Sequence, residues 1–133
     1  MSAFSDYLET TLGTLLLKGG AYTSGAVYLA LFTSAPSDAG GGVECSYVGY
    51  ARQQAHTTVV SDGFNASAGT FTNAKSVSFP AVAGATITVT HWALFSAVSA
   101  GNLLFHAPLT NSKTLDVNDV LNFPISSISI TLA

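Results

Sequence analysis

The sequence carries little charge. Asp, Glu, Lys and Arg make up 8% of its 133 residues, whereas a typical soluble domain has about 25%. The four basic residues, Lys18, Arg52, Lys75 and Lys113, each lie more than twenty positions apart. Because a phosphate backbone is bound by clustered Lys and Arg, this spacing argues against a nucleic-acid partner. Low charge combined with 48% apolar residues also argues against disorder.

Cysteine and long apolar runs are scarce as well. The single cysteine, Cys45, excludes an intramolecular disulfide. Purely apolar runs such as 15–17 and 93–95 are far shorter than the about 20 residues that span a bilayer, so we expect no membrane insertion. No basic segment followed by an apolar stretch opens the chain, so we predict no cleaved secretory signal and expect synthesis and folding in a cytoplasm.

The length predicts a single domain that covers residues 1–133. A domain of this size buries about two thirds of its unfolded surface. Eight Phe, five Tyr and one Trp are enough aromatic side chains for a core without disulfides.

The first part of the chain has the pattern of a helix. Asp6 and Glu9 suit the N-terminal end of the helix dipole, and Lys18 followed by Gly19 suits the C-terminal end. We predict one amphipathic helix over about residues 4–18, whose stripe packs on the domain's own sheet or, alternatively, docks on a neighbouring subunit. Its apolar stripe has the three-and-four spacing of a helix face and consists of Phe4, Tyr7, Leu8, Leu12, Leu15 and Leu16.

From about residue 21 to 133 the pattern becomes one of alternation, with turn residues every eight to twelve positions. No helical pattern separates the strand-like segments, so we predict an all-β domain, an antiparallel β-sandwich or flattened barrel of about eight strands. The candidate strands are 26–33, 50–60, 68–73, 75–79, 85–95, 102–109, 113–117, 119–123 and 127–132.

The segment 85–95 alternates most clearly. Strict alternation places residues 87, 89, 91, 93 and 95 on a core face. The threonines at 86, 88 and 90 then face water or a partner. Trp92 and Leu94 continue that second face, so we expect the helix or another chain to cover its end.

The residues that could carry out catalysis do not form a recognisable motif. The stretch 34–49 contains three consecutive glycines but no Gly-Lys-Ser/Thr of a phosphate-binding loop, so we interpret it as a contact loop. No Gly-x-Ser-x-Gly elbow is present. Glu44 beside Cys45 is the wrong setting for a reactive thiolate. Asp116 and Asp119 suit a turn. We therefore predict no enzyme activity and no cofactor.

The three histidines, His56, His91 and His106, lack the short spacing of a zinc site, and we predict no metal. We expect His91 to be a core histidine that is hydrogen-bonded to a backbone carbonyl. His106 is expected at an exposed or interface position.

The polar surface must be built largely from hydroxyl groups. The chain has 16 Ser and 15 Thr but 11 charged residues. Protein interfaces are depleted in charge and enriched in aromatic side chains. The composition is thus typical of a subunit that other protein covers, and we expect a homo-oligomer.

Several segments, in order along the chain, resemble small structural proteins of tailed bacteriophages that are often described as tail fibre or minor tail proteins. At 44–48 this chain has Glu-Cys-Ser-Tyr-Val where those proteins tend to be rich in glycine, so the contacts of the loop cannot be carried over. The matching segments are 19–23, 27–42, 49–53, 77–81, 90–95, 101–110 and 130–132.

The resemblance implies a non-enzymatic subunit of the virion, at a tail fibre or baseplate, that binds other virion proteins. Tyr and Arg are common interface anchors. The candidate interface residues are Tyr7, Asp38, Tyr47, Tyr50, Arg52, Trp92 and His106.

Two alternatives stay open at this stage. Small β domains of similar size also serve as capsid decoration proteins. A glycan-binding module at a fibre tip is the other alternative, with an exposed Trp92 stacking on sugar.

Overall fold

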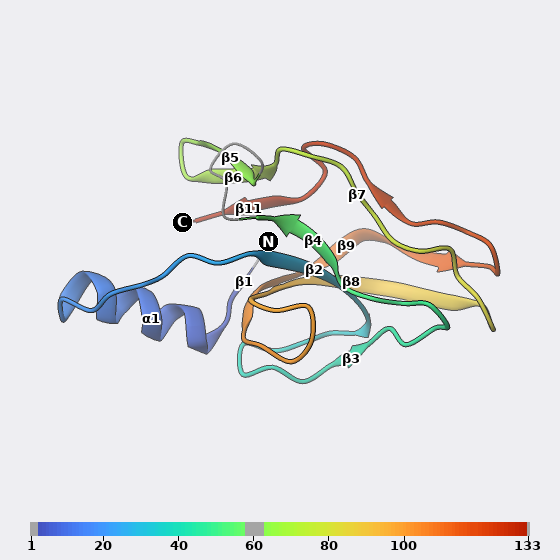
Figure 1. Ribbon diagram of the computed structural model, residues 1–133, viewed down its shortest axis with the longest axis horizontal. Helices are drawn as coiled ribbons and strands as arrows, with labels where there is room; N and C mark the ends of the chain where they lie inside the picture. The colour runs from blue at the N-terminus through green and yellow to red at the C-terminus, as the bar shows by residue number, and fades with distance from the viewer. Residues whose placement is uncertain (1–2, 58–62, 133) are drawn as a thin grey trace.

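The computed structural model describes residues 3–57 and 63–132 (Figure 1). Within these residues the chain forms one α-helix and eleven β-strands. The elements in chain order are β1 (Ala3–Phe4), α1 (Asp6–Leu17), β2 (Val27–Ser34), β3 (Val43–Glu44), β4 (Gln53–His56), β5 (Phe64–Ser67), β6 (Thr70–Asn73), β7 (Val77–Ser78), β8 (Ile87–Phe95), β9 (Leu103–Leu115), β10 (Asn122–Phe123) and β11 (Ser129–Thr131).

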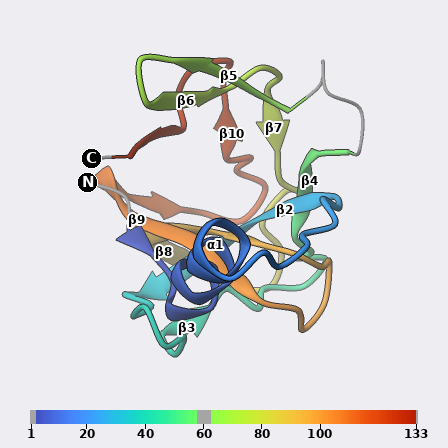
Figure 2. The ribbon, with the colours of Figure 1, turned by 90° about the vertical axis from the view of Figure 1, so that its left-hand side faces the viewer.

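The strands form one large antiparallel sheet and two small ones. The large sheet has the order β1-β9-β8-β2-β3, and β4 pairs with β2 as well. The small sheets are β11-β6-β5 and the pair β10-β7, and they lie over one face of the large sheet (Figures 1 and 2). The all-β prediction is confirmed. Of the two architectures it allowed, the open sheets have the sandwich-like one and do not close into a barrel.

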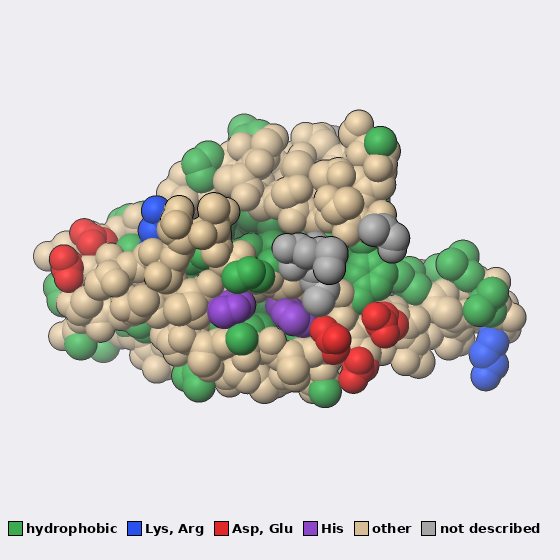
Figure 3. Space-filling view, turned by 180° about the vertical axis from the view of Figure 1, so that it is seen from behind, with side chains coloured by type: hydrophobic (Ala, Val, Ile, Leu, Met, Phe, Trp, Pro, Cys, Tyr) green, Lys and Arg blue, Asp and Glu red, His purple; other side chains and the backbone are tan. Residues whose placement is uncertain are grey.

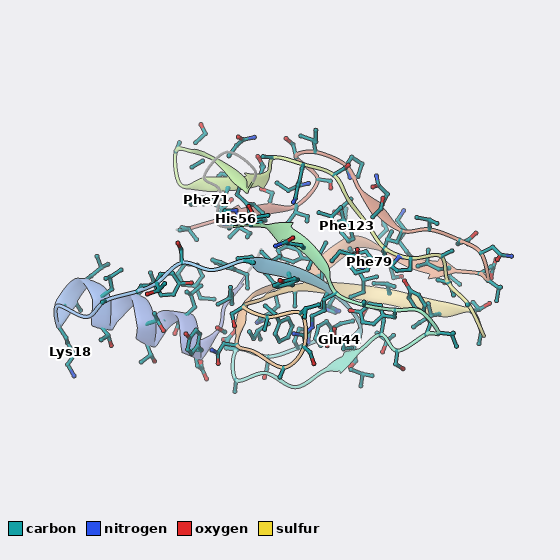
Figure 4. All side chains as sticks on the ribbon, in the orientation of Figure 1. Lys18, Glu44, His56, Phe71, Phe79 and Phe123 are labelled. Carbon is teal, nitrogen blue, oxygen red and sulfur yellow. The ribbon has the colours of Figure 1, made fainter. Side chains whose placement is uncertain are left out.

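The main core lies between the two layers. Leu29 and Leu31 of β2 are fully buried there. Ile128 is also fully buried and belongs to the layer that contains the two small sheets, called the upper layer below. Phe79 and Phe123, which are labelled in Figure 4, meet edge to face with ring centroids 6.1 Å apart. Burial of this apolar surface is the main force that holds the layers together.

The alternation prediction for β8 is wrong beyond Val89. Ile87 and Val89 belong to the core between the layers, but so do Trp92 and Leu94, so the inward positions change from odd to even. The change coincides with an irregularity in the pairing of β8 with β9, because the partner register changes from Val89↔Lys113 to His91↔Pro108. The extra residues of this bulge lie in β9, and Pro108 cannot donate a ladder hydrogen bond at that point.

Most predicted strands are confirmed, with shorter bounds. The segments 102–109 and 113–117 are instead one strand, β9, which continues through the bulge. The predicted strand 50–60 starts later, at Gln53, and its residues 58–60 lie outside the described part of the chain. Three strands, β1, β3 and β5, were not predicted, because two of them are only two residues long and β5 has only four residues, with Phe64 as its one large apolar side chain.

The helix prediction is right in position and only partly right in packing. Ser5 caps α1, because its hydroxyl accepts from the Leu8 amide and donates to the Leu103 carbonyl. Leu8 is buried, but Leu16 and Leu17 are 77% and 85% exposed. The helix therefore packs on the sheet through its first turns alone, and its second half projects from the body (Figure 1).

Asn73 joins the upper layer to the C-terminal segment. This side chain is fully buried. Its amide group donates to the carbonyls of Lys75 and Pro124, both at 2.8 Å. Its oxygen accepts from the Ile128 amide, also at 2.8 Å. All hydrogen-bonding groups of the side chain are thus used, as buried polar groups require.

Candidate functional site

The segment 34–49 is more ordered than the predicted irregular loop. Ser37 and Gly40 exchange two backbone hydrogen bonds and close a tight turn. Gly42 has a φ of +74°, and a Cβ there would lie 2.8 Å from the Pro36 nitrogen, so only glycine fits. The chain then returns as β3, antiparallel to β2. The glycines therefore serve a compact hairpin at the edge of the large sheet.

A bidentate ion pair lies at the base of this hairpin. The Arg52 guanidinium binds both carboxylate oxygens of Glu44 at 2.8 Å, the strongest geometry for this pair. Nη1 of Arg52 also donates to the carbonyls of Ala97 and Ala100. The guanidinium lies 3.7 Å from the centre of the Phe95 ring. The Arg52 side chain thus connects β3, the segment after β8 and the Phe95 ring at the end of β8.

Tyr50 extends this network into the sheet. Its hydroxyl donates to Glu44 at 2.8 Å and accepts from the Leu31 amide at 3.0 Å. Tyr47 packs edge to face on Tyr50, with ring centroids 5.4 Å apart, and its hydroxyl donates to the Pro80 carbonyl. Burial is the main cause that raises the pKa of both phenols. The phenol hydroxyls are therefore fixed, protonated groups of the fold at neutral pH.

A shallow hollow of about 590 Å³ opens beside these residues. Tyr47 and Ser46 line one side, and Val98 and Ser99 line the other. Glu44 and Arg52 also line the hollow. Its wall is partly aromatic and partly polar, a combination that suits a polar ligand with an apolar face.

Cys45 lines the same hollow but is not a nucleophile in this setting. The residue is 4% exposed. Burial first, and the neighbouring Glu44 carboxylate second, raise the pKa of its thiol to about 11. A reactive cysteine requires the opposite shift. Cys45 therefore acts as a small core side chain.

Asp38 and His106 meet, although 68 positions separate them in the sequence. His106 Nε2 lies 2.9 Å from Asp38 Oδ1, which ties the turn of the hairpin to β9. The His106 side chain is 13% exposed and the Asp38 side chain 53%. The predicted exposed position of His106 is thus half right: the residue lies at the surface, beneath a carboxylate.

His91 lies near His106 and not in the core. Its Nδ1 pairs with the Thr90 hydroxyl at 2.8 Å, so the expected bond to a backbone carbonyl is not what holds it. Partial burial, and then the positive charge of a protonated His106, lower the pKa of His91. Acidic side chains gather beside two histidines on this side of the molecule (Figure 3).

The structure brings the predicted interface residues together as two groups. Tyr47, Tyr50 and Arg52 form one group around Glu44. Tyr7 and Asp38 line another hollow, of about 410 Å³, at the first turn of α1. Trp92 belongs to neither group. It is 5% exposed and lies in the core between the layers, so the expectation that it forms a platform or is covered by another chain is corrected.

Two further apolar features lie at the surface. The first is the leucine end of α1, where Leu16 of the predicted stripe and its neighbour Leu17 are exposed, so this end does not pack on the chain's own sheet, and its docking on a neighbouring subunit stays a prediction. The second is a groove of about 210 Å³ between the layers with an entirely apolar wall. Its wall includes Val27, Phe71, Leu94, Phe105, Ile130 and Leu132. The three consecutive leucines at 15–17 could have indicated an exposed apolar surface, because successive residues point in different directions around a helix and cannot all face one sheet.

Across residues 3–57 and 63–132, no three His, Cys, Asp or Glu side chains are grouped as a metal site requires. In the same residues, no helix has the length and apolar character to cross a bilayer.

A family model described as "Gp80: Podophage GP4 fiber I protein gp80" matches residues 3–131, which is nearly the whole chain. A search of curated proteins finds no match.

Proposed function

The chain belongs to the podophage fiber I protein family, and on this basis we propose that it is a structural subunit of the tail fibre which binds other virion proteins and further copies of itself. Membership of this family identifies the chain as a fibre protein and hence as a component of the virion. Position on the tail, partners and oligomeric state are the proposed part. The match over residues 3–131 is the observation that carries it.

The polar chemistry of the candidate site supports a role without catalysis. Arg52, Glu44 and Tyr50 bind one another or the backbone. Cys45 is buried, with a raised pKa, which is the reverse of nucleophile activation. Such saturated networks hold loops in place, and a surface that binds protein needs them to keep its shape.

The distribution of apolar surface supports protein partners. Val43, Val48 and Val98 are 58%, 69% and 54% exposed, and they belong to the segments 43–52 and 96–101 that Arg52 connects. Leu16 and Leu17 form a second exposed patch at the end of α1. With few charges to desolvate, both patches are suited to be covered by protein.

The number of copies per particle tests this proposal. Purified virions of the phage that encodes the chain are digested, and the chain is quantified by mass spectrometry with isotope-labelled standards. A tail fibre subunit is expected at a small multiple of the rotational symmetry of the tail. A copy number that follows the much larger count of capsid subunits supports the capsid decoration alternative. Absence from purified particles contradicts both.

A glycan-binding role is a second candidate, favoured by one observation. The 590 Å³ hollow at Tyr47, Ser46 and Ser99 combines an aromatic wall with hydroxyl groups, as sugar binding requires. Trp92 is not available for stacking, because it is buried. A glycan array with the isolated chain tests this candidate, with Tyr47→Ala as the matched variant. Binding that Tyr47→Ala abolishes supports it, and an array without signal contradicts it.

A further inference from the structure

A second hollow adjoins the 590 Å³ hollow described above. It holds about 310 Å³ and is lined by residues of the segments 46–48 and 83–87. Ser46 and Tyr47 line both hollows, so these two residues lie where the hollows meet. In Figure 1 the loop after β8, the segment after β3 and the turn before β8 follow one another along the lower side of the molecule. The two hollows together are therefore elongated, and they are called the Tyr47 track below.

The Tyr47 track offers a ligand no net charge. Of the described residues that line it, only Arg52 and Glu44 are charged. Arg52 binds both carboxylate oxygens of Glu44, and one of these oxygens also accepts from the Tyr50 hydroxyl. The two charges therefore compensate each other within the pair. A charged ligand would lose hydration in the track and find no free counter-charge in return.

Neutral hydroxyl groups supply polar contacts along the whole track. Ser99 lines the first hollow and Ser46 lines both, and both residues are exposed. In the second hollow the Thr86 hydroxyl donates to Asp116, which leaves its oxygen free to accept. Tyr47 adds an aromatic wall between these groups. A ligand with many hydroxyl groups, apolar ring faces and no charge matches this surface, and a neutral saccharide has these properties.

Internal hydrogen bonds hold the walls of the track in place. Nη1 of Arg52 donates to the carbonyls of Ala97 and Ala100, which fixes the stretch between them on one side of the first hollow. The Tyr47 hydroxyl donates to the Pro80 carbonyl at 2.8 Å, which fixes the aromatic wall. A site that is already in shape loses little conformational entropy when a ligand binds. Preorganisation therefore favours the binding of a neutral ligand that gains nothing from ion pairs.

We propose that the Tyr47 track binds a neutral saccharide chain, with sugar units on both sides of Tyr47. This inference rests on the glycan-binding candidate described above and goes beyond it. It specifies the charge of the ligand from the Arg52–Glu44 pair, and it adds a second contact region at the 310 Å³ hollow. A single sugar unit can occupy only one of the two hollows, so a chain of units is expected to bind more tightly.

The first test compares saccharides of different length and charge. The full chain is applied to an array that carries neutral di- to hexasaccharides of glucose, galactose, rhamnose and N-acetylglucosamine, the corresponding single sugars, and saccharides that contain uronic acids or sulfate. Signal from neutral oligosaccharides, with little from single sugars or anionic saccharides, is the expected result. Equal signal from single sugars, or strongest signal from anionic saccharides, overturns the proposal and leaves glycan binding intact. An array without any signal contradicts both.

The second test fills each hollow separately. Ser99→Tyr places a bulky side chain in the first hollow, and Ala85→Tyr does so in the second; both positions are exposed, so Tm should not change. Each variant is expected to weaken binding of the best neutral oligosaccharide by about tenfold or more in titration calorimetry. The control Ser112→Tyr, exposed on β9 and outside both hollows, should keep the wild-type affinity.

The two variants also separate the proposal from the functions on which it rests. If only one of them weakens binding, the ligand occupies a single hollow, so the two-sided contact is wrong and glycan binding stands. If neither weakens binding, the saccharide binds elsewhere on the chain, and the track is wrong as a site. The structural role in the fibre is tested independently by the number of copies per particle.

Discussion

Arg52 and Glu44 form a bidentate ion pair at the base of the β2–β3 hairpin, with both nitrogen–oxygen distances at 2.8 Å. The Arg52 side chain is 9% exposed. Its remaining donors hold the carbonyls of Ala97 and Ala100. A residue that the sequence suggested as an interface anchor is thus first a structural connector, and any partner would meet the surface that it shapes.

Replacing Arg52 by Lys should destabilise the fold although the charge is kept. Lysine cannot form the fork geometry, so the second bond to Glu44 and the bonds to the two alanine carbonyls are lost. We expect a loss of about 2–4 kcal/mol in the free energy of unfolding, since breaking a largely buried pair typically costs about 3–5 kcal/mol. Urea unfolding followed by tyrosine and tryptophan fluorescence measures this change. Lys113→Met, at an exposed position, is the control and should shift stability by less than about 0.5 kcal/mol.

Asn73→Ala should be among the most destabilising substitutions in the upper layer. It leaves the buried Ile128 amide and the carbonyls of Lys75 and Pro124 without their partner. Each unsatisfied buried group costs about 1–3 kcal/mol, so we expect a loss of about 3 kcal/mol or more. Thermal and urea unfolding measure it, with the exposed Asn65→Ala as the matched variant. Equal stabilities of the two variants would show that the hydrogen bonds of Asn73 contribute little.

The fold should lose stability in alkali, beginning at Cys45. Burial raises the pKa of its thiol from 9.0 to about 11, so the folded state holds the proton more tightly than the unfolded state. The free energy of unfolding must then fall as the pH rises from about 9 to about 11. Tyr50, whose pKa burial raises above 10.0, adds to the loss above that pH. Urea midpoints from neutral pH upward should decline for the wild type and start to decline later for Cys45→Ala. Identical profiles would contradict this assignment.

His91 should weaken the fold in mild acid. Partial burial and the neighbouring His106 lower its pKa below 6.5, so the folded state binds this proton less well than the unfolded state. Stability that is present at neutral pH should therefore be lost as the pH falls below about 6.5. In His106→Gln, the pKa of His91, followed by NMR of its ring protons, should rise because one opposing charge is gone. An unchanged value would show that the two rings do not interact.

The sequence predicted those features that depend on local pattern. Alternation located β2 and β8 within one or two residues, and the apolar spacing with Asp6 and Glu9 in the first turn located α1. The turn at 116–119 was also read correctly, since the Asp116 amide donates to an Asp119 carboxylate oxygen. These features require only neighbours in the chain, and a single sequence contains that information.

The features that were missed depend on contacts between distant segments. The change of face that puts Trp92 in the core coincides with the shift in register between β8 and β9 at Val89–His91, which no local pattern reveals. Asp38 and His106 meet across 68 positions. Periodicity predicted an apolar stripe on α1 but could not tell that the chain's own sheet ends before Leu16. The candidate surface was therefore predicted as a set of residues, and only the structure shows which of them meet.

The position of the chain on intact particles tests the central claim most directly. Virions are labelled with gold-conjugated antibody raised against the folded chain and imaged by electron microscopy. Membership of the fiber I protein family predicts label confined to the tail and its fibres. Label spread over the capsid shell, or intact particles that carry no label while the antibody binds the purified chain, would contradict the account.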